Sequence, residues 1–338
     1  MNLKNKKILV TGGASFIGSH LVDSLVDLGC KVRVVDDLSS GKKENLQEHL
    51  IRKRIEFIKG DLLTEKTLKK SFKNIDLVFH LAAVHGGRGF VDLHQAESST
   101  NFALDNLVFR SCLKAGVEKI VFASSGCVYP NFLQKDPKKK VYLTEEMVGP
   151  PYDSDNIYGW AKLMAEKSLV AYRQTWGIKT ASCRFFTVYG ERGVENHAII
   201  SFIARAFIKQ NPFLIWGNGQ QVRNWTYVGD IVKGLILTAQ KIDNGQAINL
   251  GTNERIKVID AVQEIFRLTN FYPKIKFMPQ MPTGPYNRVA DNQLAKKLLG
   301  WEPQVFFKDG LKRTLDWYFA NKKPAEVKKN LKEKLTNR

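Results

Sequence analysis

Short apolar runs alternate with longer stretches of helical periodicity through the first half of the chain. Six of these runs are four to six residues long and rich in β-branched and aromatic residues, which is typical of buried strands. Helix-length segments separate them, so we expect right-handed βαβ units and one parallel sheet. The pattern predicts strands over residues 7–10, 31–35, 55–58, 76–80, 119–124 and 180–185.

The pattern changes after about residue 190, where strand signals weaken and Gly, Pro and aromatic residues gather in loops such as GNGQQ and PTGPYNR. A chain of 338 residues is long enough for a doubly wound domain and a smaller second lobe. We therefore expect an α/β fold. The predicted parts are a doubly wound parallel sheet (1–186 and 223–258), a smaller mixed α/β lobe that binds substrate (187–222 and 259–321) and a polar tail or terminal polar helix (322–338).

The composition excludes several classes of protein. No apolar run approaches the length of about 18 residues that a membrane span needs, and MNLKNKKILV lacks the apolar segment of a secretory signal. The four cysteines lie far apart and form neither a zinc-ligand pattern nor a disulfide framework. We expect a cytoplasmic protein with no metal site and no membrane contact.

The formal net charge of +19 is compatible with nucleic-acid binding, but its distribution argues against that function. The excess lysines are dispersed, for example over residues 138–140 and in the tail after residue 322, and no recognition motif accompanies them. We expect a solvated basic surface that helps to attract an anionic substrate, and no nucleic-acid partner.

A dinucleotide fingerprint follows the first predicted strand. TGGASFIG leads directly into the helical pattern SHLVDSLVDLG, so Gly12 permits a tight turn and Gly18 permits close helix packing. Ser15 stands where a third glycine is usual, but it is small. A helix is expected to begin near Phe16 and Ile17, and the free backbone amides at its N-terminus are expected to bind a pyrophosphate. These features predict a Rossmann-type sheet.

An acidic residue ends the second predicted strand. Asp36 lies eighteen residues after Gly18, where a carboxylate accepts hydrogen bonds from the adenine ribose and repels a 2′-phosphate. NAD is therefore expected rather than NADP, although Lys42 and Lys43 in the next loop could soften that preference. Asp61 is placed to meet the adenine or to cap a helix. The expected cofactor contacts also include Leu62 and Ala82.

Two further segments carry candidate chemistry: SSGCVYP after the fifth predicted strand, and YGWAK in a helical stretch. Positions i and i+4 share one face of a helix, so Lys162 lies beside Tyr158 and is expected to stabilise its phenolate. Tyr158 then serves as a base near neutral pH. Ser125 is expected to hydrogen-bond the substrate oxygen on which Tyr158 acts.

Together these residues resemble the extended short-chain dehydrogenase/reductase family, specifically its nucleotide-sugar epimerases and dehydratases. The resemblance implies that Ser125, Tyr158 and Lys162 oxidise the sugar at C4 with NAD, and that Arg223 and Arg288 hold the diphosphate. Nearly the whole chain takes part, through TGGASFIG, VVDDLSSG, KGDL, FHLAA, SSGCVYP, YGWAK, RFFTVYG, WGNGQQVRNWTYVGD and LGWEP.

The reaction that follows C4 oxidation depends on the residues beside the sugar. Gly126 and Cys127 replace the acidic residues of dehydratases and decarboxylases, which disfavours elimination and loss of CO2. SSGCVYP and AAVHGGRGF resemble GDP-mannose 3,5-epimerases and GDP-fucose synthases, in which the cysteine is an acid/base group. The resemblance implies a GDP-sugar and a second acid/base group, His197. The expected substrate contacts are His85, Gly86, Gly87, Arg88 and Asn196.

Asp36 favours NAD that is retained through the cycle, so we expect a redox-neutral epimerase that inverts C3, C5 or both. A C4 epimerase or C4 dehydrogenase stays open, with Cys127 only packing. A 4-keto-sugar epimerase/reductase of the GDP-fucose synthase type also stays open. A non-catalytic dinucleotide-binding regulator would normally lose Tyr158 or Lys162, and both are present.

The family usually forms homodimers through two helices of the cofactor domain, one of which carries the catalytic tyrosine. The resemblance therefore implies a homodimer here. Apolar positions after Tyr158 supply surface for both the core and a partner, namely Leu163, Met164, Leu169 and Val170.

Overall fold

A seven-stranded parallel sheet forms the centre of the computed structural model, which describes residues 1–336. The strand order is β11-β6-β5-β4-β1-β2-β3, and all six strands that the sequence predicts are present. The seventh strand, β11, was not predicted. The strands are β1 (Lys7–Thr11), β2 (Lys31–Asp36), β3 (Ile55–Lys59), β4 (Leu77–His80), β5 (Lys119–Ser125), β6 (Lys179–Phe185) and β11 (Asn244–Leu250).

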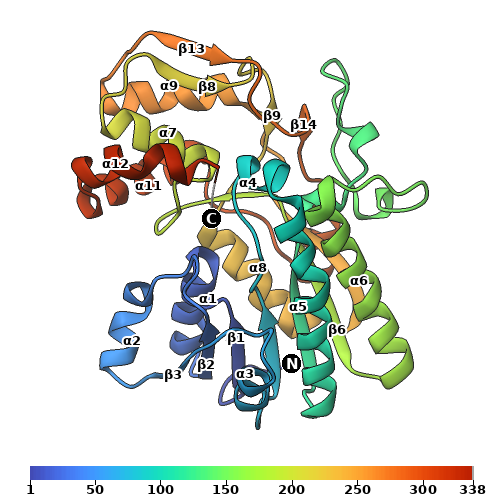
Figure 1. Ribbon diagram of the computed structural model, residues 1–338. Coiled ribbons are helices and arrows are strands. Elements are labelled where there is room, and N and C mark those ends of the chain that lie inside the picture. Colours follow the sequence, from blue (N-terminus) through green and yellow to red (C-terminus); the bar gives the residue numbers. More distant parts are fainter. Residues whose placement is uncertain (337–338) are drawn as a thin grey trace.

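Helices cover both faces of this sheet (Figure 1). One face packs against buried side chains of α1 (Phe16–Asp27), α8 (Val228–Lys241) and α10 (Gln293–Leu299). The other face packs against α3 (Glu65–Ser71), α5 (Gln95–Lys114) and α6 (Asn156–Trp176). Burial on both faces explains why the strands read as nearly continuous apolar runs. The expected Rossmann-type doubly wound fold is confirmed.

The strand order reverses beside β1, which pairs with β2 on one side and with β4 on the other. The loops that follow β1 and β4 diverge and leave a crevice at the carboxyl edge of the sheet. Ligands of doubly wound folds bind at such a crevice. The fold therefore brings the ends of β1, β2, β4 and β5 to one site.

A second lobe lies over this edge (Figure 1). Its core is built from apolar side chains of helices and of the parallel pair β8 and β13. Its elements are α7 (Ala198–Phe207), β8 (Phe213–Trp216), α9 (Val258–Thr269), β13 (Ile275–Met278), α11 (Phe307–Asn321) and α12 (Pro324–Lys334).

Small sheets connect the two lobes. Strand β7 (Thr187–Tyr189) pairs with β10 (Trp225–Tyr227), and β9 (Val222–Arg223) lies between β12 (Ile256–Lys257) and β14 (Asn287–Arg288). No helix among the described residues is long and apolar enough to cross a membrane. The remaining elements are α2 (Gln47–Ile51), α4 (Arg88–Leu93), η1 (Lys43–Leu46), η2 (Gly126–Val128), η3 (Asn131–Leu133) and η4 (Glu145–Met147).

The segment expected to be a polar tail is largely helical. Helix α12 begins with Pro324 at its first turn, a position that proline tolerates because that amide has no partner within the helix. Val327 and Leu331 are buried in the core of the second lobe. The helix therefore belongs to the folded structure, and only residues 337–338 of the expected tail lie outside the described part.

Candidate active site

One cavity of about 620 Å³ runs along the carboxyl edge of the sheet and beneath the second lobe. It is lined by every residue that the sequence predicts for catalysis, cofactor binding or substrate binding, with the exception of Gly18. The motifs are far apart in the sequence, so the fold brings them together. Residues 1–336 contain no cluster of three or more His, Cys, Asp or Glu side chains that could hold a metal ion.

The glycine-rich loop forms one end of the cavity. Gly12 has a φ of +68°, and a Cβ there would lie 2.9 Å from the amide nitrogen of Ala82. Gly18 does not line the cavity because it packs against the loop, where a Cβ would lie 2.2 Å from the carbonyl oxygen of Gly12. Ser15 is the N-cap of α1 but makes no side-chain cap. Ser15, Phe16 and Ile17 line the cavity at this helix end, and the N-terminus of a helix is a site that suits a pyrophosphate.

Asp36 is buried where β2 reaches the same end of the cavity. Its carboxylate accepts hydrogen bonds from the amides of Ala14 and Leu38, both at 2.9 Å, which fix its orientation. Asp61 is exposed and accepts a hydrogen bond from the amide of Leu63 at 2.8 Å, so it stabilises a turn at the cavity wall. These residues fit the adenosine half of NAD.

Tyr158 and Lys162 lie on one face of α6, and both are buried. The Lys162 ammonium lies 5.7 Å from the centre of the Tyr158 ring and 4.4 Å from that of Phe122. Burial raises the pKa of Tyr158 well above its usual value, although the Ser125 hydrogen bond opposes this, and burial lowers the pKa of Lys162. Burial therefore favours the protonated form of Tyr158 in this structure.

Buried carboxylates surround this pair, and the sequence analysis did not find them. Asp105 accepts a hydrogen bond from His80 Nε2 at 3.0 Å, and its charge raises the pKa of Lys162 against the effect of burial. Glu166, one helical turn after Lys162, pairs with Arg184 at 2.8 Å. The negative charges of Asp105 and Glu166 favour the protonated, charged form of Lys162 next to Tyr158.

Cys127 lies in η2, directly after β5. Its amide donates to Ser125 Oγ at 3.1 Å, and Arg288 Nη1 donates to its Sγ at 3.2 Å. Arg288 and Arg88 both pair with Asp155, at 2.9 and 2.7 Å. Burial would raise the pKa of Asp155, but the two arginines lower it to about 2. Arg288, expected on the diphosphate, therefore lies beside the thiol and also pairs in register with Arg223 on the neighbouring strand.

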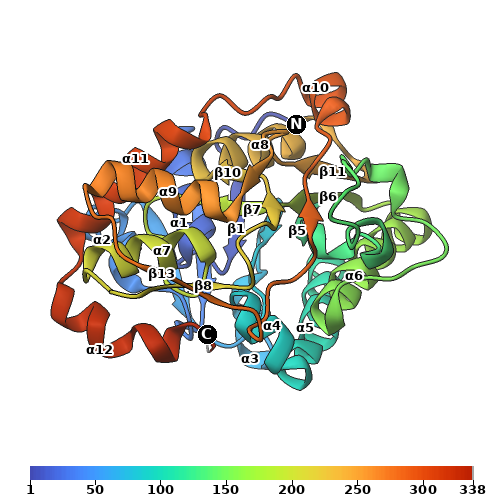
Figure 2. The same cartoon turned by 90° about the horizontal axis from the view of Figure 1, so that it is seen from above.

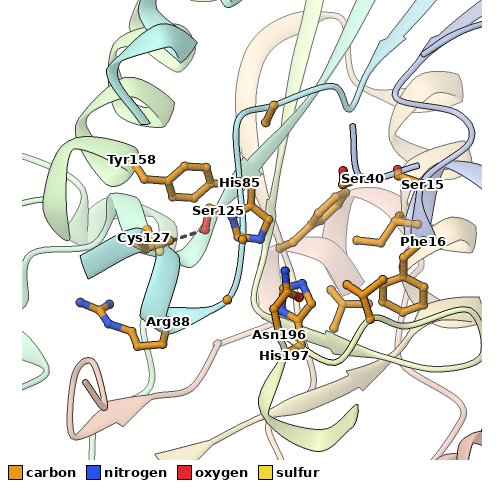
Figure 3. A pocket seen from close by; sticks show the side chains of 18 of the residues that line it. Ser15, Phe16, Ser40, His85, Arg88, Ser125, Cys127, Tyr158, Asn196 and His197 are labelled. Carbon is orange, nitrogen blue, oxygen red and sulfur yellow. Dashed lines mark hydrogen bonds between the residues drawn. The ribbon is translucent and has the colours of Figure 1, made fainter. Parts of the chain in front are cut away.

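His197 faces the cavity from another wall, at the N-cap of α7 (Figure 3). The ring of His85 lies 4.8 Å from that of Tyr158 and 5.5 Å from that of His197. Burial lowers the pKa of His197 to about 4, below the value near 6.5 of a free imidazole. Its ring is therefore neutral at pH 7.

Close packing explains why glycine stands at positions 86 and 87 of AAVHGGRGF, and the sequence alone did not reveal this packing. A Cβ at Gly87 would lie 1.7 Å from the carbonyl oxygen of Asn196, and a Cβ at Gly86 would meet the Phe90 side chain at 2.6 Å. The two loops of the sugar end therefore cross at Gly87. Asn196 Oδ1 is buried and accepts no hydrogen bond within residues 1–336.

Two arginines in the cavity wall, the buried Arg205 and the half-buried Arg223, form no ion pair with a carboxylate among the described residues. Arg223 donates to the Thr283 carbonyl at 2.8 Å, and burial lowers its pKa to about 9. Arg205 on α7 was missed by the sequence analysis. It is 2% exposed, it donates hydrogen bonds to Ser201 and lies 6.0 Å from the centre of the Phe202 ring, and burial lowers its pKa to about 10. Uncompensated cations facing one cavity indicate an anionic ligand.

Proteins with similar sequences are named as nucleotide-sugar epimerases. An uncharacterised UDP-glucose epimerase of Bacillus subtilis is 35% identical over 90% of this chain and 95% of its own. GDP-mannose 3,5-epimerase of Arabidopsis thaliana is 30% identical over 93% of this chain and 82% of its own.

A solved structure of UDP-glucose 4-epimerase from Thermotoga maritima with UDP-glucose superposes with a TM-score of 0.81. It is 31% identical and covers 92% of this chain and 98% of that one. The UDP-glucose 4-epimerase of Thermus thermophilus in complex with NAD is 26% identical with a TM-score of 0.83, over 94% of this chain and 100% of that one. A family model described as NAD dependent epimerase/dehydratase family matches residues 8–251. The chain therefore belongs to the NAD-dependent epimerase/dehydratase family and is an NAD-dependent enzyme of the nucleotide-sugar epimerase group.

Proposed function

We propose that this enzyme oxidises a GDP-linked, mannose-like sugar at C4, inverts C3, C5 or both, and then reduces C4 again. The observation that carries this proposal is the placement of Cys127 and His197. Both line the cavity that also holds Tyr158, and they approach it from different walls (Figure 3). Inversion at a carbon needs one group to remove a proton from one face and another to deliver a proton to the opposite face.

The C4 step belongs to Tyr158, Ser125 and Lys162. When NAD is bound it accepts the hydride from C4 and later returns it. Tyr158 takes the proton of the C4 hydroxyl, so the oxygen becomes a ketone as the hydride leaves. Because burial raises the pKa of Tyr158, the charge of Lys162 must favour the phenolate at that moment, and Ser125 holds the same oxygen. Gly12, Ser15 and Asp36 hold the cofactor.

The ketone acidifies the hydrogens on C3 and C5, and the starting charges assign the two roles. The neutral imidazole of His197 removes a proton, which makes it a cation. The Cys127 thiol delivers a proton to the opposite face and becomes a thiolate. Arg288 Nη1, 3.2 Å from Sγ, then stabilises that thiolate. No net charge enters the cavity during the exchange.

The diphosphate is held by Arg223 and Arg205. Neither cation has a carboxylate partner in the described part of the chain, and two phosphate charges would offset them. Arg288 remains paired with Asp155 at the sugar end, where Arg88 and His85 contact the hexose. Arg88 and His85 distinguish the sugar pocket of this chain from a purely glycine-rich one.

A second candidate is a C4 epimerase that acts on a UDP-sugar. Relatives named as UDP-glucose epimerases favour it, at 35% and 31% identity, against 30% for the GDP-mannose 3,5-epimerase. In that case Cys127 and His197 only pack against the sugar. A 4-keto-sugar reductase would consume an external reduced cofactor instead.

Incubation with a panel of nucleotide sugars in deuterated water, followed by NMR, separates these candidates. The proposal predicts deuterium at C3 or C5 of a GDP-sugar, with no net consumption of cofactor. Inversion at C4 of a UDP-sugar without deuterium at carbon would establish the second candidate. Stoichiometric loss of added NADPH would establish a reductase.

We also expect a homodimer in the cytoplasm. Leu163 and Leu169 pack inside the cofactor domain, whereas Met164 on α6 and Phe102 on α5 are 47% and 41% exposed. These exposed apolar side chains on adjacent helices suit a partner subunit. All four cysteines are free, as a reducing compartment requires. A strictly monomeric mass by light scattering at micromolar concentration would contradict the dimer.

A further inference from the structure

A buried carboxylate lies directly before the two residues that face the sugar from the second lobe. Glu195 is 2% exposed and precedes Asn196 and His197. Three groups near the C-terminus bind it: Tyr318 donates its hydroxyl proton at 2.9 Å, the Lys334 ammonium lies at 3.0 Å and that of Lys322 at 3.8 Å. No catalytic role described above uses this cluster, which we name the Glu195 clasp.

The Glu195 clasp joins the sugar-facing loop to the last helix. Burial alone would raise the pKa of Glu195, but Lys322 and Lys334 hold it below its usual value, so the carboxylate is ionised. An ionised group this deeply buried depends on its partners, because leaving it unpaired costs far more than an exposed ion pair contributes. Lys334 is near the end of α12, so the loop and the helix end are held as one unit.

The same helix reaches the opposite lobe. Leu335, the C-cap of α12, lines the cavity. A Cβ at Gly89 on α4 would lie 2.5 Å from the Leu335 carbonyl oxygen, so the two helices touch with room for glycine only. Figure 2 shows α12 ending close to α4. The end of the C-terminal helix therefore joins the two lobes at one wall of the cavity.

The position of His197 depends on short local bonds in addition to the clasp. Its amide donates to the Val194 carbonyl at 3.1 Å, and its own carbonyl accepts from Ser201 at 2.8 Å. Residues Val194 to Ser201 thus form a tight turn into α7, with Glu195 as its buried anchor. Releasing that anchor would free His197 without touching Tyr158, which lies on α6.

We propose that Glu195 is a positioning residue that, through Lys334 and α12, holds His197 in place for proton transfer. This inference rests on the proposed function for the role of His197, but the clasp itself is a property of the protein without substrate. It adds the C-terminal helix to the parts of the chain that determine turnover.

Two variants break the clasp, and a third is matched to them. Glu195→Gln removes the buried charge, and Lys334→Met removes the nearer ammonium from a side chain that is 38% exposed. Lys332→Met removes an exposed lysine from the same helix and is the control. Lys334→Met leaves the buried Glu195 itself unchanged. It therefore tests the clasp even if Glu195→Gln does not fold.

The first measurement is amide hydrogen exchange of the segment 194–201, followed by mass spectrometry without substrate. We expect exchange about 10- to 100-fold faster in Glu195→Gln and Lys334→Met, from the loss of a charge-assisted hydrogen bond, and wild-type exchange in Lys332→Met. Equal exchange in the wild type and all three variants would overturn the clasp. This measurement holds whichever sugar the enzyme uses.

The second measurement compares deuterium exchange at C3 and C5 with C4 oxidation in the same variants. We expect the ratio of the two rates to fall about 10-fold or more in the clasp variants and to stay unchanged in the control, because Tyr158 is unaffected. Equal losses in both steps would show that Glu195 only supports the fold. Wild-type protein that exchanges no carbon-bound hydrogen with any sugar would refute the proposed function instead.

Discussion

Arg205 is buried and has no ion-pair partner among residues 1–336, which permits a prediction in which stability and function change in opposite directions. Burial lowers the pKa of Arg205 from the usual value of a guanidinium to about 10. One pKa unit corresponds to about 1.4 kcal/mol, so the charge costs the ligand-free protein about 3 kcal/mol. Methionine has a similar length and no charge. Arg205→Met loses the bonds to Ser201, and we expect a net gain of about 1–3 kcal/mol in unfolding free energy.

The same substitution is expected to weaken substrate binding. Arg205 faces the cavity beside Arg223, and a charged hydrogen bond to phosphate is worth about 10- to 100-fold in affinity. The phosphate takes no part in the reaction, so KM should rise by this factor while kcat changes little. Thermal unfolding of the ligand-free protein, together with steady-state kinetics, measures both effects.

Arg184→Met is the matched control, because Arg184 is equally buried but pairs with Glu166 at 2.8 Å. Removing it leaves a buried carboxylate unpaired, so we expect destabilisation by about 3–5 kcal/mol. The reasoning is refuted if Arg205→Met lowers the melting temperature as Arg184→Met does, or if its KM equals that of the wild type.

Three further predictions follow from the site. Tyr158→Phe should slow C4 oxidation by about 100- to 10,000-fold and leave nucleotide-sugar affinity by calorimetry nearly unchanged; undiminished turnover would remove Tyr158 from the mechanism. Because the pKa of His197 is lowered to about 4, its neutral, proton-accepting form persists as pH falls, and the ratio of C3/C5 exchange to C4 oxidation should stay flat from pH 7 to 5.5. A drop of about eightfold over that interval would indicate an ordinary imidazole. Denatured protein should release NAD because Asp36 is fixed at the ribose end; release of NADP alone would contradict that assignment.

The sheet was largely predictable because burial on both faces leaves strong apolar runs in the sequence. Strand β11 escaped because NGQAINL is half polar and its pairing with β6 is irregular between Asn244 and Ala247. Helix α12 was predicted only as one of two alternatives, a polar tail or a polar helix. It is rich in lysine, and only Val327 and Leu331, four residues apart, face the core. A two-residue apolar stripe is too short to distinguish from a polar tail.

The motif residues of the site were predictable because their chemistry depends on local spacing. The groups that set their charge were not, because their partners are distant in sequence: Asp155 and Arg288 are 133 residues apart. Arg205 did carry a signal, since it is a charged residue inside the apolar helix AIISFIARAF. The lowered pKa of His197 and the raised pKa of Tyr158 follow from burial, which only the folded structure supplies.

The central claim is that Cys127 and His197 move protons at the carbons beside C4. The most direct test is solvent deuterium exchange into the sugar of a GDP-linked substrate by Cys127→Ser and His197→Asn, with absorbance of the reduced cofactor followed in parallel. Both variants are predicted to retain C4 oxidation while losing exchange at C3 and C5. Wild-type rates of carbon exchange in both variants would contradict the account and leave an enzyme that works at C4 alone.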